Sequence, residues 1–273
     1  PNKNFRLVNN TKPLFSYIID TLLQTDYINK IYIIIDNPKT ELIINSYYAN
    51  QNNLNNIIFY KRPKKLEGHH ISTNELFIDL IQNLNLQADY YFQTHTTNPL
   101  LKKETIQNAI KYFLENNTNL YDSLFSVKEL KTRLYTQKTE ALNHNINELI
   151  PTQDLEPLYE ENSCMYVFTR ETIEKKRHRI GNNPYMFKMN DIESQDIDTE
   201  SDFKIAELLI LERTEKINKN QNKPVVLITG VLGGIGYSTA NLFIENNYEV
   251  VGIDINNENK NNENKNNENK NNE

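Results

Sequence analysis

The chain has 273 residues with a formal net charge of -6, and it contains no tryptophan and a single cysteine. An acidic chain lacks the basic face that a general nucleic-acid binder needs, and one cysteine excludes a disulfide framework. No apolar run reaches the roughly 18 residues of a membrane helix. We therefore expect a cytoplasmic protein whose partners include neither nucleic acid nor a membrane.

Strands and helices alternate through the first 214 residues. Apolar spacing predicts helices at 14–23, 40–51, 72–84 and 102–115, and strands at 31–35, 57–60, 90–94, 124–127 and 165–168. This alternation predicts an α/β fold with three layers, in which helices cover both faces of a mostly parallel sheet. Ligands of such sheets bind at the carboxyl ends of the strands, so motifs that follow strands carry the functional interpretation.

One long segment interrupts this alternation. Residues 128–159 are polar and show no periodicity. Structureless segments of this length are usually lids, binding arms or partner contacts. We expect the segment to have one of these roles rather than to be part of the core.

Composition divides the rest of the chain. Five of the seven glycines lie between residues 230 and 252, and residues 215–223 are polar and aperiodic, which predicts a linker. From residue 256 an Asn-Asn-Glu-Asn-Lys unit is written three times, without an apolar residue to offset the entropy cost of ordering. The predicted parts are a domain at 1–214, a linker at 215–223, a smaller piece at 224–255 and a disordered tail at 256–273. Self-association of the Asn-rich tail is the alternative.

Asp196 and Asp198 flank Ile197 just before a predicted helix. On an extended backbone, residues two apart point to one face, so both carboxylates would converge while Ile197 is buried on the other side. Two carboxylates at a strand end suit Mg²⁺, which takes the rest of its shell from water and phosphates. A solvated acidic turn is the alternative interpretation. Thr199 is the predicted N-cap of the helix, whose apolar stripe is Phe203, Ala206, Leu209 and Ile210.

Other polar side chains follow predicted strands. Arg62, after the strand at 57–60, could hold a base or a phosphate, or be a surface charge. Gln93 and Asn162 could bind sugar hydroxyls, with capping or turn roles as the alternative. Cys164 is expected to pack like a small hydrophobe, because no neighbouring base would activate it.

These motifs occur in an order that is typical of one family. They are Lys3-Asn4, Arg62-Pro63, Ser72-Thr73, Gln93 with Thr97-Asn98-Pro99-Leu100, Asn162 with Tyr166, and Asp196-Ile197-Asp198 with Asp202. Through them, residues 1 to about 211 resemble the acylneuraminate cytidylyltransferases, which are the CMP-sialic acid synthetases and their relatives. The resemblance implies the three-layer fold of the nucleotide-diphospho-sugar transferases.

The resemblance also implies a reaction. The anomeric hydroxyl of a sialic-acid-like 2-keto sugar acid attacks the α-phosphate of CTP, and pyrophosphate leaves. Catalysis would fall to Lys3, Asp196 and Asp198, with Mg²⁺ on the two aspartates. The implied nucleotide-binding residues are Asn4, Arg62, Ser72 and Thr73, and the implied sugar-binding residues are Gln93, Asn162 and Tyr166. A homodimer through 128–159 is implied as well.

The chain departs from the family pattern in three places, one of which is His69-His70, where many members have an acidic turn. Family members begin with a strand and an Ala-Arg-x-Gly-Ser-Lys loop around the CTP phosphates, and Pro1 follows the position of that loop. We therefore expect the strand between those at 31–35 and 90–94 to be missing, and the chain as written to be inactive. The family's arginine for the sugar carboxylate is also absent near Pro151, where Lys131 and Arg133 are the nearest candidates.

A second resemblance lies in residues 224–255. A predicted strand, a glycine turn, a helix start and a second strand are followed by Asp254, and Gly230, Gly234 and Gly236 match a Thr-Gly-x-x-x-Gly-x-Gly signature. This piece resembles the start of a short-chain dehydrogenase, whose glycines and acidic residue bind NAD. The catalytic Ser, Tyr and Lys of that family do not follow, so we expect NAD to be a cofactor only of a complete dehydrogenase domain.

Two alternatives to cytidylyl transfer stay open from the sequence. One is a non-catalytic dimeric binding module with the same fold. The other is a bifunctional fusion with an NAD-dependent short-chain dehydrogenase.

Overall fold

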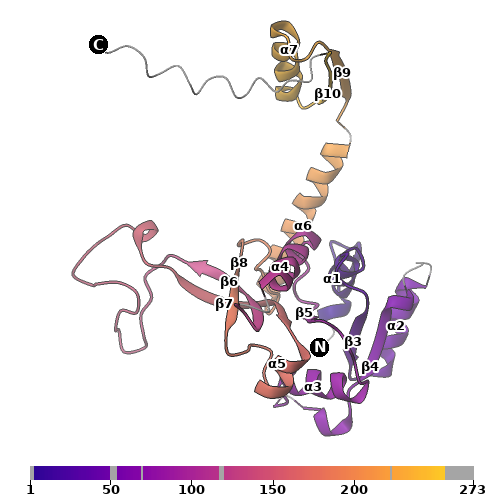
Figure 1. The fold of residues 1–273 in the computed structure, drawn as a ribbon, viewed down its shortest axis with the longest axis vertical. Helices are drawn as coiled ribbons and strands as arrows, with labels where there is room; N and C mark the ends of the chain where they lie inside the picture. Colours follow the sequence, from indigo (N-terminus) through magenta and orange to yellow (C-terminus); the bar gives the residue numbers. More distant parts are fainter. Residues whose placement is uncertain (1–2, 50–53, 69, 117–119, 222, 256–273) are drawn as a thin grey trace. The chain divides into compact units, whose positions relative to one another are not determined.

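The computed structural model describes residues 3–49, 54–68, 70–116, 120–221 and 223–255 (Figure 1). The chain divides into two compact units, Pro1–Ile210 and Leu211–Glu273. This boundary lies close to the predicted end of the first domain at residue 214. The predicted tail at 256–273 lies outside the described residues.

The first unit contains the predicted helices and strands with shifts of up to three residues at their ends, except that the strand predicted at 165–168 begins seven residues earlier, at Leu158, and so extends into the predicted irregular segment. Its helices are α1 (Leu14–Leu23), α2 (Pro38–Tyr48), α3 (Thr73–Asn83), α4 (Lys103–Asn116) and α5 (Arg170–Lys176), and α6 (Glu200–Gln221) begins in it. Its strands are β1 (Leu7–Val8), β2 (Lys12–Pro13), β3 (Ile31–Ile35), β4 (Ile57–Lys61), β5 (Tyr91–Gln93), β6 (Ser123–Leu130), β7 (Leu158–Phe168) and β8 (Pro184–Met189). The capping box of Ser72 with Glu75 is confirmed at the start of α3. The predicted elements include no counterpart of α5, β8, β1 or β2.

The α/β class is confirmed, but the mostly parallel single sheet is not. β3 pairs with β4 in parallel, and a separate sheet has the order β5-β7-β6-β8. Strand β7 is antiparallel to both of its neighbours, whereas β6 and β8 are parallel. The physical reason is the connection: no α-helix lies between β6 and β7, and a parallel return needs a crossover, usually a helix.

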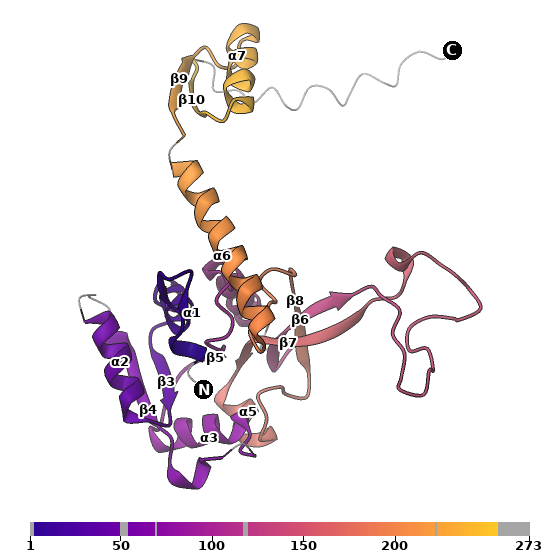
Figure 2. The ribbon, with the colours of Figure 1, turned by 180° about the vertical axis from the view of Figure 1, so that it is seen from behind.

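The side chains of β7 alternate between two cores. Met165 and Val167 belong to a buried cluster that includes the inner face of α4, and Tyr166 and Phe168 belong to one that includes residues of α3 and α5. Helix α4 accordingly lies on one side of the sheet, and α3 with α5 lies on the other (Figures 1 and 2). These two layers hold the ends of β5 and β7, where the polar motifs lie.

A large cavity separates the two sheets. Among the described residues, β3 pairs only with β4, and β5 only with β7. The space between them is lined by the whole of β3 and β5 and by apolar residues of α1 and α3, and its volume is about 1180 Å³. The three central residues of β3 are only half-buried, whereas the continuous apolar run predicted a strand covered on both faces. Two strand edges therefore face a space with an apolar lining.

We predict that an extended apolar segment attached ahead of Pro1 fills this space and pairs with both strand edges. Each net backbone hydrogen bond contributes roughly 0.5–1.5 kcal/mol, and 1 kcal/mol shifts the midpoint by about 2–4 °C in a protein of this size. The melting temperature measured by circular dichroism should rise by about 5 °C or more. A Gly-Ser extension of equal length is the control, and equal midpoints for the two extensions would contradict the prediction.

The segment between β6 and β7 is an extended arm. It projects from the sheet and contains an isolated bridge between Tyr135 and Ala141. Its tip exposes apolar side chains, with Leu142, Ile146 and Leu149 at 58%, 69% and 90% exposure. The arm is otherwise irregular, as the lack of periodicity predicted.

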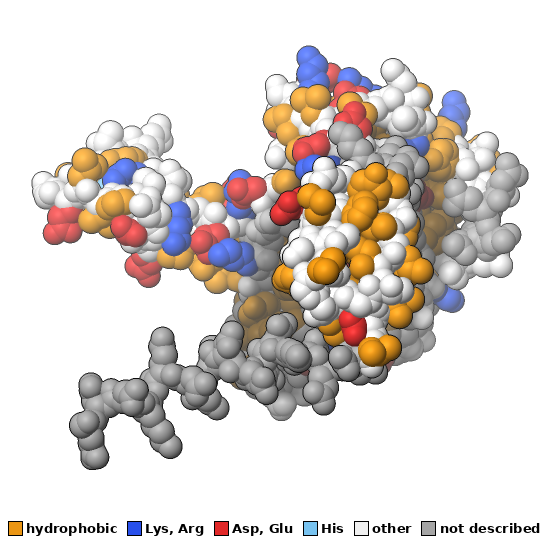
Figure 3. Space-filling model, turned by 90° about the horizontal axis from the view of Figure 1, so that it is seen from above, with side chains coloured by type: hydrophobic (Ala, Val, Ile, Leu, Met, Phe, Trp, Pro, Cys, Tyr) orange, Lys and Arg blue, Asp and Glu red, His pale blue; other side chains and the backbone are white. Residues whose placement is uncertain are grey.

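The second unit has the predicted strand–helix–strand order. Its elements are β9 (Val225–Thr229), α7 (Gly234–Glu245) and β10 (Glu249–Ile253), and the two strands are parallel. Gly230 has a φ of +70°, and a Cβ on Gly236 would lie 2.1 Å from the Gly230 carbonyl oxygen, so this turn requires both glycines. Hydrophobic side chains are spread over its surface, including Val225, Leu227 and Ile235 (Figure 3).

Residues 215–221 are helical, so the prediction of an irregular linker at 215–223 is wrong for this part of the chain. Helix α6 continues to Gln221 and ends ahead of Pro224. Lysine, glutamine and glutamate are adequate helix formers, so a helix that starts on a packed face can continue through a polar stretch. The first proline after it disfavours helical backbone at the preceding residue. No described helix has the length and apolar character needed to cross a membrane.

Candidate active site

The acidic pair is held by the residue between its members. Ile197 is fully buried, Asp196 is half-buried and the Asp198 side chain is 80% exposed. The Ile197 amide donates to the Thr97 carbonyl oxygen at 3.1 Å, which ties this segment to the loop after β5. The predicted alternation is confirmed, although residues 196–198 form no strand because their backbone lacks a ladder partner. Both carboxylates are thereby displaced from the core.

The start of α6 fixes the backbone of Asp198. The Asp202 carboxylate accepts hydrogen bonds from the amides of Thr199 at 2.7 Å and Asp198 at 3.1 Å, and the Asp202 amide donates to the Thr199 hydroxyl at 3.2 Å. The bonds from Thr199 and then Asp198 lower the pKa of Asp202. These bonds confirm Thr199 as the N-cap of α6. The Asp202 carboxylate is occupied by the hydrogen bonds at the start of the helix and is not counted among the ligand-binding groups.

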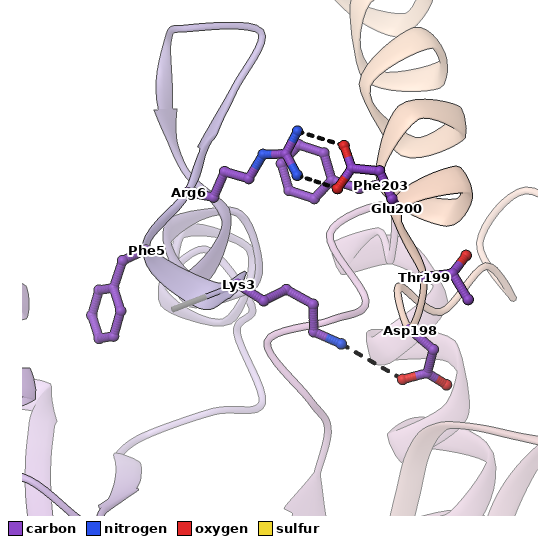
Figure 4. Close-up of a pocket in the computed structure, with 7 residues that line it drawn as sticks. All are labelled: Lys3, Phe5, Arg6, Asp198, Thr199, Glu200 and Phe203. Carbon is purple, nitrogen blue, oxygen red and sulfur yellow. Dashed lines mark hydrogen bonds and ion pairs between the residues drawn. The ribbon is translucent and has the colours of Figure 1, made fainter. Parts of the chain in front are cut away.

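Lys3 and Asp198 line a small cavity, and Asp196 is not part of its lining. Its ammonium donates to the Ile197 carbonyl oxygen and lies 3.6 Å from Asp198 Oδ1 (Figure 4). Arg6 and Glu200, which the sequence did not indicate, form a two-bond ion pair in the same cavity at 2.5 and 2.8 Å. The cavity volume is about 470 Å³. Because Arg6 is paired with Glu200, Lys3 is the cation that faces Asp198.

The large cavity between the sheets collects candidates from both predicted groups. Asn4, Arg62, Thr73 and Gln93 all line it. Arg62 is oriented by Asp36, whose Oδ1 lies 2.9 Å from the arginine Nε. The structure therefore brings predicted nucleotide-binding residues and a predicted sugar-binding residue to one space.

The remaining nucleotide-binding candidate has a structural role. Ser72 does not line this cavity in the structure, and its hydroxyl accepts from the Glu75 amide at 3.3 Å. That bond satisfies a free amide in the first turn of α3. Ser72 therefore orients the helix that presents Thr73.

Asn162 and Tyr166 lie within protein networks. Asn162 accepts from the Ser126 hydroxyl at 2.5 Å and donates to the Ser194 hydroxyl at 3.0 Å. Tyr166 is fully buried, and its hydroxyl bonds with Glu161 and, at 3.2 Å, with Ser163. The polar atoms of Asn162 and Tyr166 that were predicted to bind sugar hydroxyls are thus already hydrogen-bonded to other protein groups. Both residues therefore have structural roles beside the site.

Cys164 is a packed, protonated thiol, as predicted. It is fully buried, and burial, followed by the charges of Asp196 and Glu193, raises its pKa to about 12. The Asn98 side-chain amide donates to its sulfur at 3.3 Å and to Asp196 Oδ1 at 3.4 Å. Cys164 and Asn98 are therefore the buried residues on which Asp196 is packed.

Several residues of the site were absent from the candidates. His95 lines the large cavity, and its Nε2 lies 2.9 Å from Gln93 Nε2. Burial and then the charge of Arg179 lower the pKa of His95, while Asp196 and Asp198 raise it. Among the described residues, buried polar atoms with neither a hydrogen-bond nor an ion-pair partner are Gln93 Oε1, Thr94 Oγ1, Asn98 Oδ1 and Arg179 Nε. Unpaired atoms of this kind mark a place where a polar ligand can bind.

The aspartate pair fits a magnesium ion that also binds phosphates. No cluster of three or more His, Cys, Asp or Glu side chains suited to a metal occurs among the described residues. Mg²⁺ is commonly bound through one or two carboxylates plus substrate phosphates. The exposed carboxylate of Asp198 is the type of ligand that such an ion takes, and half-buried Asp196, whose Oδ1 accepts from Asn98 Nδ2 at 3.4 Å, is the second carboxylate two positions away.

Glu193 holds the turn that precedes the acidic pair. It is 2% exposed and accepts from the Lys102 amide at 3.0 Å and from Asn190 Nδ2 at 2.8 Å. Burial alone would raise its pKa, but hydrogen bonds from Thr105, Asn190 and Lys102 lower it. The turn is thereby attached to the N-terminus of α4.

A family match covers most of this chain. The model of the Cytidylyltransferase family matches residues 1–232, which include the whole first unit and the acidic pair. The chain belongs to this cytidylyltransferase family. It is therefore a nucleotidyltransferase by family.

Relatives and solved structures agree with this assignment. Post-translational flagellin modification protein B of Campylobacter coli is 24% identical over 78% of this chain and 89% of its own length. A Helicobacter pylori protein named pseudaminic acid cytidylyltransferase and UDP-2,4-diacetamido-2,4,6-trideoxy-beta-L-altropyranose hydrolase is 22% identical over 73% of this chain and 38% of its own length. The fold is similar to a CMP:2-keto-3-deoxy-manno-octonic acid synthetase complexed with CTP, with a TM-score of 0.56, 11% identity, and coverage of 78% of this chain and 93% of that one.

The glycine turn of the second unit has the expected local geometry. Asp254 Oδ2 accepts from the Leu232 amide at 2.9 Å, so the carboxylate closes the turn that contains Gly230. Gly234 and Gly236 open helix α7. A dehydrogenase relationship and NAD binding at this turn stay predictions.

We predict that Glu193→Gln lowers the free energy of unfolding by about 1–3 kcal/mol at neutral pH, because it weakens buried charge-assisted hydrogen bonds. The folded pKa of Glu193 lies below its ordinary value of 4.5. The extra free energy of unfolding of the wild type is therefore fully present above pH 4.5, and it is lost as the pH falls through the folded pKa of Glu193. Urea unfolding at neutral pH and well below pH 4.5 measures this, and exposed Glu104→Gln in the first turn of α4 is the control. A difference that does not shrink in acid would contradict the assignment.

Proposed function

We propose that the first unit transfers the cytidylyl group of CTP to the anomeric hydroxyl of a sialic-acid-like 2-keto sugar acid. A new bond joins the sugar oxygen to the α-phosphorus, and the bond to pyrophosphate breaks. The observation that carries this proposal is the pair Asp196 and Asp198, presented by buried Ile197 with Lys3 at 3.6 Å from Asp198, in a chain of the cytidylyltransferase family. The names of the Helicobacter relative and of the synthetase with a similar fold support a sugar acid as acceptor.

We assign a separate role in the reaction to each group of residues from its position. Asp196 and Asp198 would hold Mg²⁺, which neutralises phosphate charge when it is bound. Asn4, Arg62 and Thr73 line the large cavity on the side of the nucleotide, and Arg62 keeps a fixed fork because Asp36 orients it. Lys3 adds a positive charge beside Asp198 and keeps that carboxylate oriented before the substrates arrive.

We further propose that activity requires a strand between β3 and β5. Arg62 directly follows β4 of one sheet, and Gln93 ends β5 of the other. Without a common strand, no backbone ladder sets the distance between these side chains. Turnover is therefore expected to rise in an extended chain that carries an apolar strand and an Ala-Arg-x-Gly-Ser-Lys loop ahead of Pro1, and pyrophosphate release from CTP measures it.

We predict that Asp196→Asn and Asp198→Asn each lower turnover by about 10²-fold or more, and weaken CTP binding less, because charge stabilisation is greatest in the transition state. Pyrophosphate release is measured in the extended chain with N-acetylneuraminic, pseudaminic and 3-deoxy-manno-octulosonic acids as acceptors. Asp191→Asn, an exposed substitution in the preceding turn, is the control. Unchanged turnover in both variants would exclude the aspartates, and no release with any acceptor would exclude the reaction.

The arm suggests a homodimer, which we also propose. Leu142, Ile146 and Leu149 are all exposed and lie within eight positions of one another in the arm, and exposed apolar groups that form a patch commonly mark protein contacts. A second copy of the chain is the partner that the family resemblance implies for this segment. The arm would then contribute to a contact rather than to the core of its own unit.

We predict that Leu149→Asp weakens dimerisation at least about tenfold, because it places a charge in an apolar contact. Sedimentation velocity over a concentration series gives the dissociation constant. Asn145→Asp adds the same charge to the same arm at a polar position and serves as the control. A wild-type chain that stays monomeric at tens of micromolar would contradict the proposed dimer.

A further inference from the structure

Arg179 lies beside the proposed sugar site but belongs to none of the predicted groups. It lies in the connection between α5 and β8, and its guanidinium carbon is 3.8 Å from the centroid of the Tyr166 ring. Tyr166 is the cross-strand partner of Gln93 in the β5–β7 pairing, so their side chains share one face of the sheet. Arg179 therefore covers the face on which Gln93 reaches the large cavity.

Among the residues that the structure describes, none carries a charge paired with Arg179. Its side chain makes no hydrogen bond or ion pair with any described residue, and its buried Nε has no acceptor. By contrast, Arg6 is paired with Glu200, and Arg170 with Glu174. A half-buried cation without an anion is costly, and the cation–π contact with Tyr166 offsets only part of that cost. The site is complete only when an anion is bound.

The backbone around Arg179 is held in place without a ligand. The Arg179 amide donates to Asn74 Oδ1 at 3.0 Å, which attaches it to the first turn of α3. Two residues on, the Gly181 amide donates to the Ser123 hydroxyl at 2.8 Å. A Cβ on Gly181 would lie 2.2 Å from the Asp122 carboxylate, so the turn passes this side chain as closely as glycine allows. Such preorganisation reduces the entropy cost of binding.

The surroundings indicate which anion binds. The charges of Arg179 and of the two aspartates all act on the pKa of His95, so the arginine and the aspartates both lie in the neighbourhood of this side chain. Gln93 Oε1 and Thr94 Oγ1, both without partners, provide polar atoms for hydroxyl groups at the same place. The phosphates of CTP belong with the metal at the aspartates. The other anion of the proposed reaction is the carboxylate of the sugar acid.

The residues suggested earlier for this carboxylate are occupied elsewhere. The Arg133 guanidinium donates to the Ile150 carbonyl oxygen, and the Lys131 ammonium donates to the Gln153 carbonyl oxygen at 3.0 Å. Both bonds lie within the exposed arm. They stabilise the arm rather than a substrate.

We propose that Arg179 binds the carboxylate of the sugar acid and thereby selects 2-keto acids over neutral sugars. The inference rests on the proposed function, because it takes the acceptor to be a sugar acid. The planar guanidinium fits a carboxylate through two parallel hydrogen bonds, and its position on Tyr166 fixes the plane of that fork. Arg179 is thus a specificity-determining residue, with Tyr166 as the residue that positions it.

The test compares an acid with its neutral ester. Binding of N-acetylneuraminic acid and of its methyl ester is measured by ligand-observed NMR in the extended chain with CTP and without Mg²⁺, so that the acid is not consumed. The wild type should bind the acid at least about tenfold more tightly, and Arg179→Gln should lose this preference, as expected when a charged hydrogen-bonded pair is removed. Arg179→Lys should restore only part of it, because lysine keeps the charge but lacks the fork. Exposed Arg177→Gln, two residues away, should keep the full preference.

The outcomes separate this inference from the proposed function. If Arg179→Gln retains the preference for the acid, or instead raises the KM for CTP alone, the assignment of Arg179 is overturned while cytidylyl transfer stands. If the wild type binds acid and ester equally well or binds neither, the inference fails as well. Pyrophosphate release, measured separately with the other sugar acids, then decides whether the proposed reaction fails with it. Unchanged melting temperatures of the variants show that the lost preference is not caused by unfolding.

Discussion

The candidate active site depends on the burial of Ile197. Its side chain is fully covered within a cluster that joins the first strand, the loop after β5 and helix α6. Burial of such a side chain contributes about 1.5–3 kcal/mol, whereas an exposed ion pair such as that of Lys3 with Asp198 contributes about 0–1 kcal/mol. Hydrophobic packing therefore orients the two carboxylates, and the ion pair only refines their positions. A site arranged in this way keeps its shape when the charge of a ligand arrives or leaves.

Features that depend on neighbouring residues could be predicted from the sequence. The capping box at Ser72, the alternation around Ile197 and the glycine turn at Gly230 each involve residues within a few positions of one another. The apolar stripe of α6 from Phe203 to Ile210 belongs to the same class, because the helical period is written locally. The α/β class followed from the succession of such local signals, and the family resemblance added the order of the motifs.

Features that depend on distant partners could not be predicted. Arg6 and Glu200 are 194 positions apart, and nothing near either residue indicates the other. The direction of β7 depends on how the arm returns to the sheet, and apolar spacing does not record strand direction. Strand β8 lies beside β6 without a clear alternation of its own, and α5 is too short to show a period. The sequence assigned no role to Arg179 for the same reason, since its importance depends on the lack of an acid nearby in space.

The position of the single cysteine has a practical consequence. Cys164 lies under Asn98, which in turn contacts Asp196, and its thiol is both fully covered and protonated at neutral pH. A thiol reagent can therefore react only when the packing around Cys164 opens locally, because the reaction needs both solvent access to the sulfur and the thiolate form. As the single cysteine of the chain, Cys164 is a natural reporter of local opening next to Asp196. Its rate of reaction with a thiol reagent would measure that opening without an introduced cysteine.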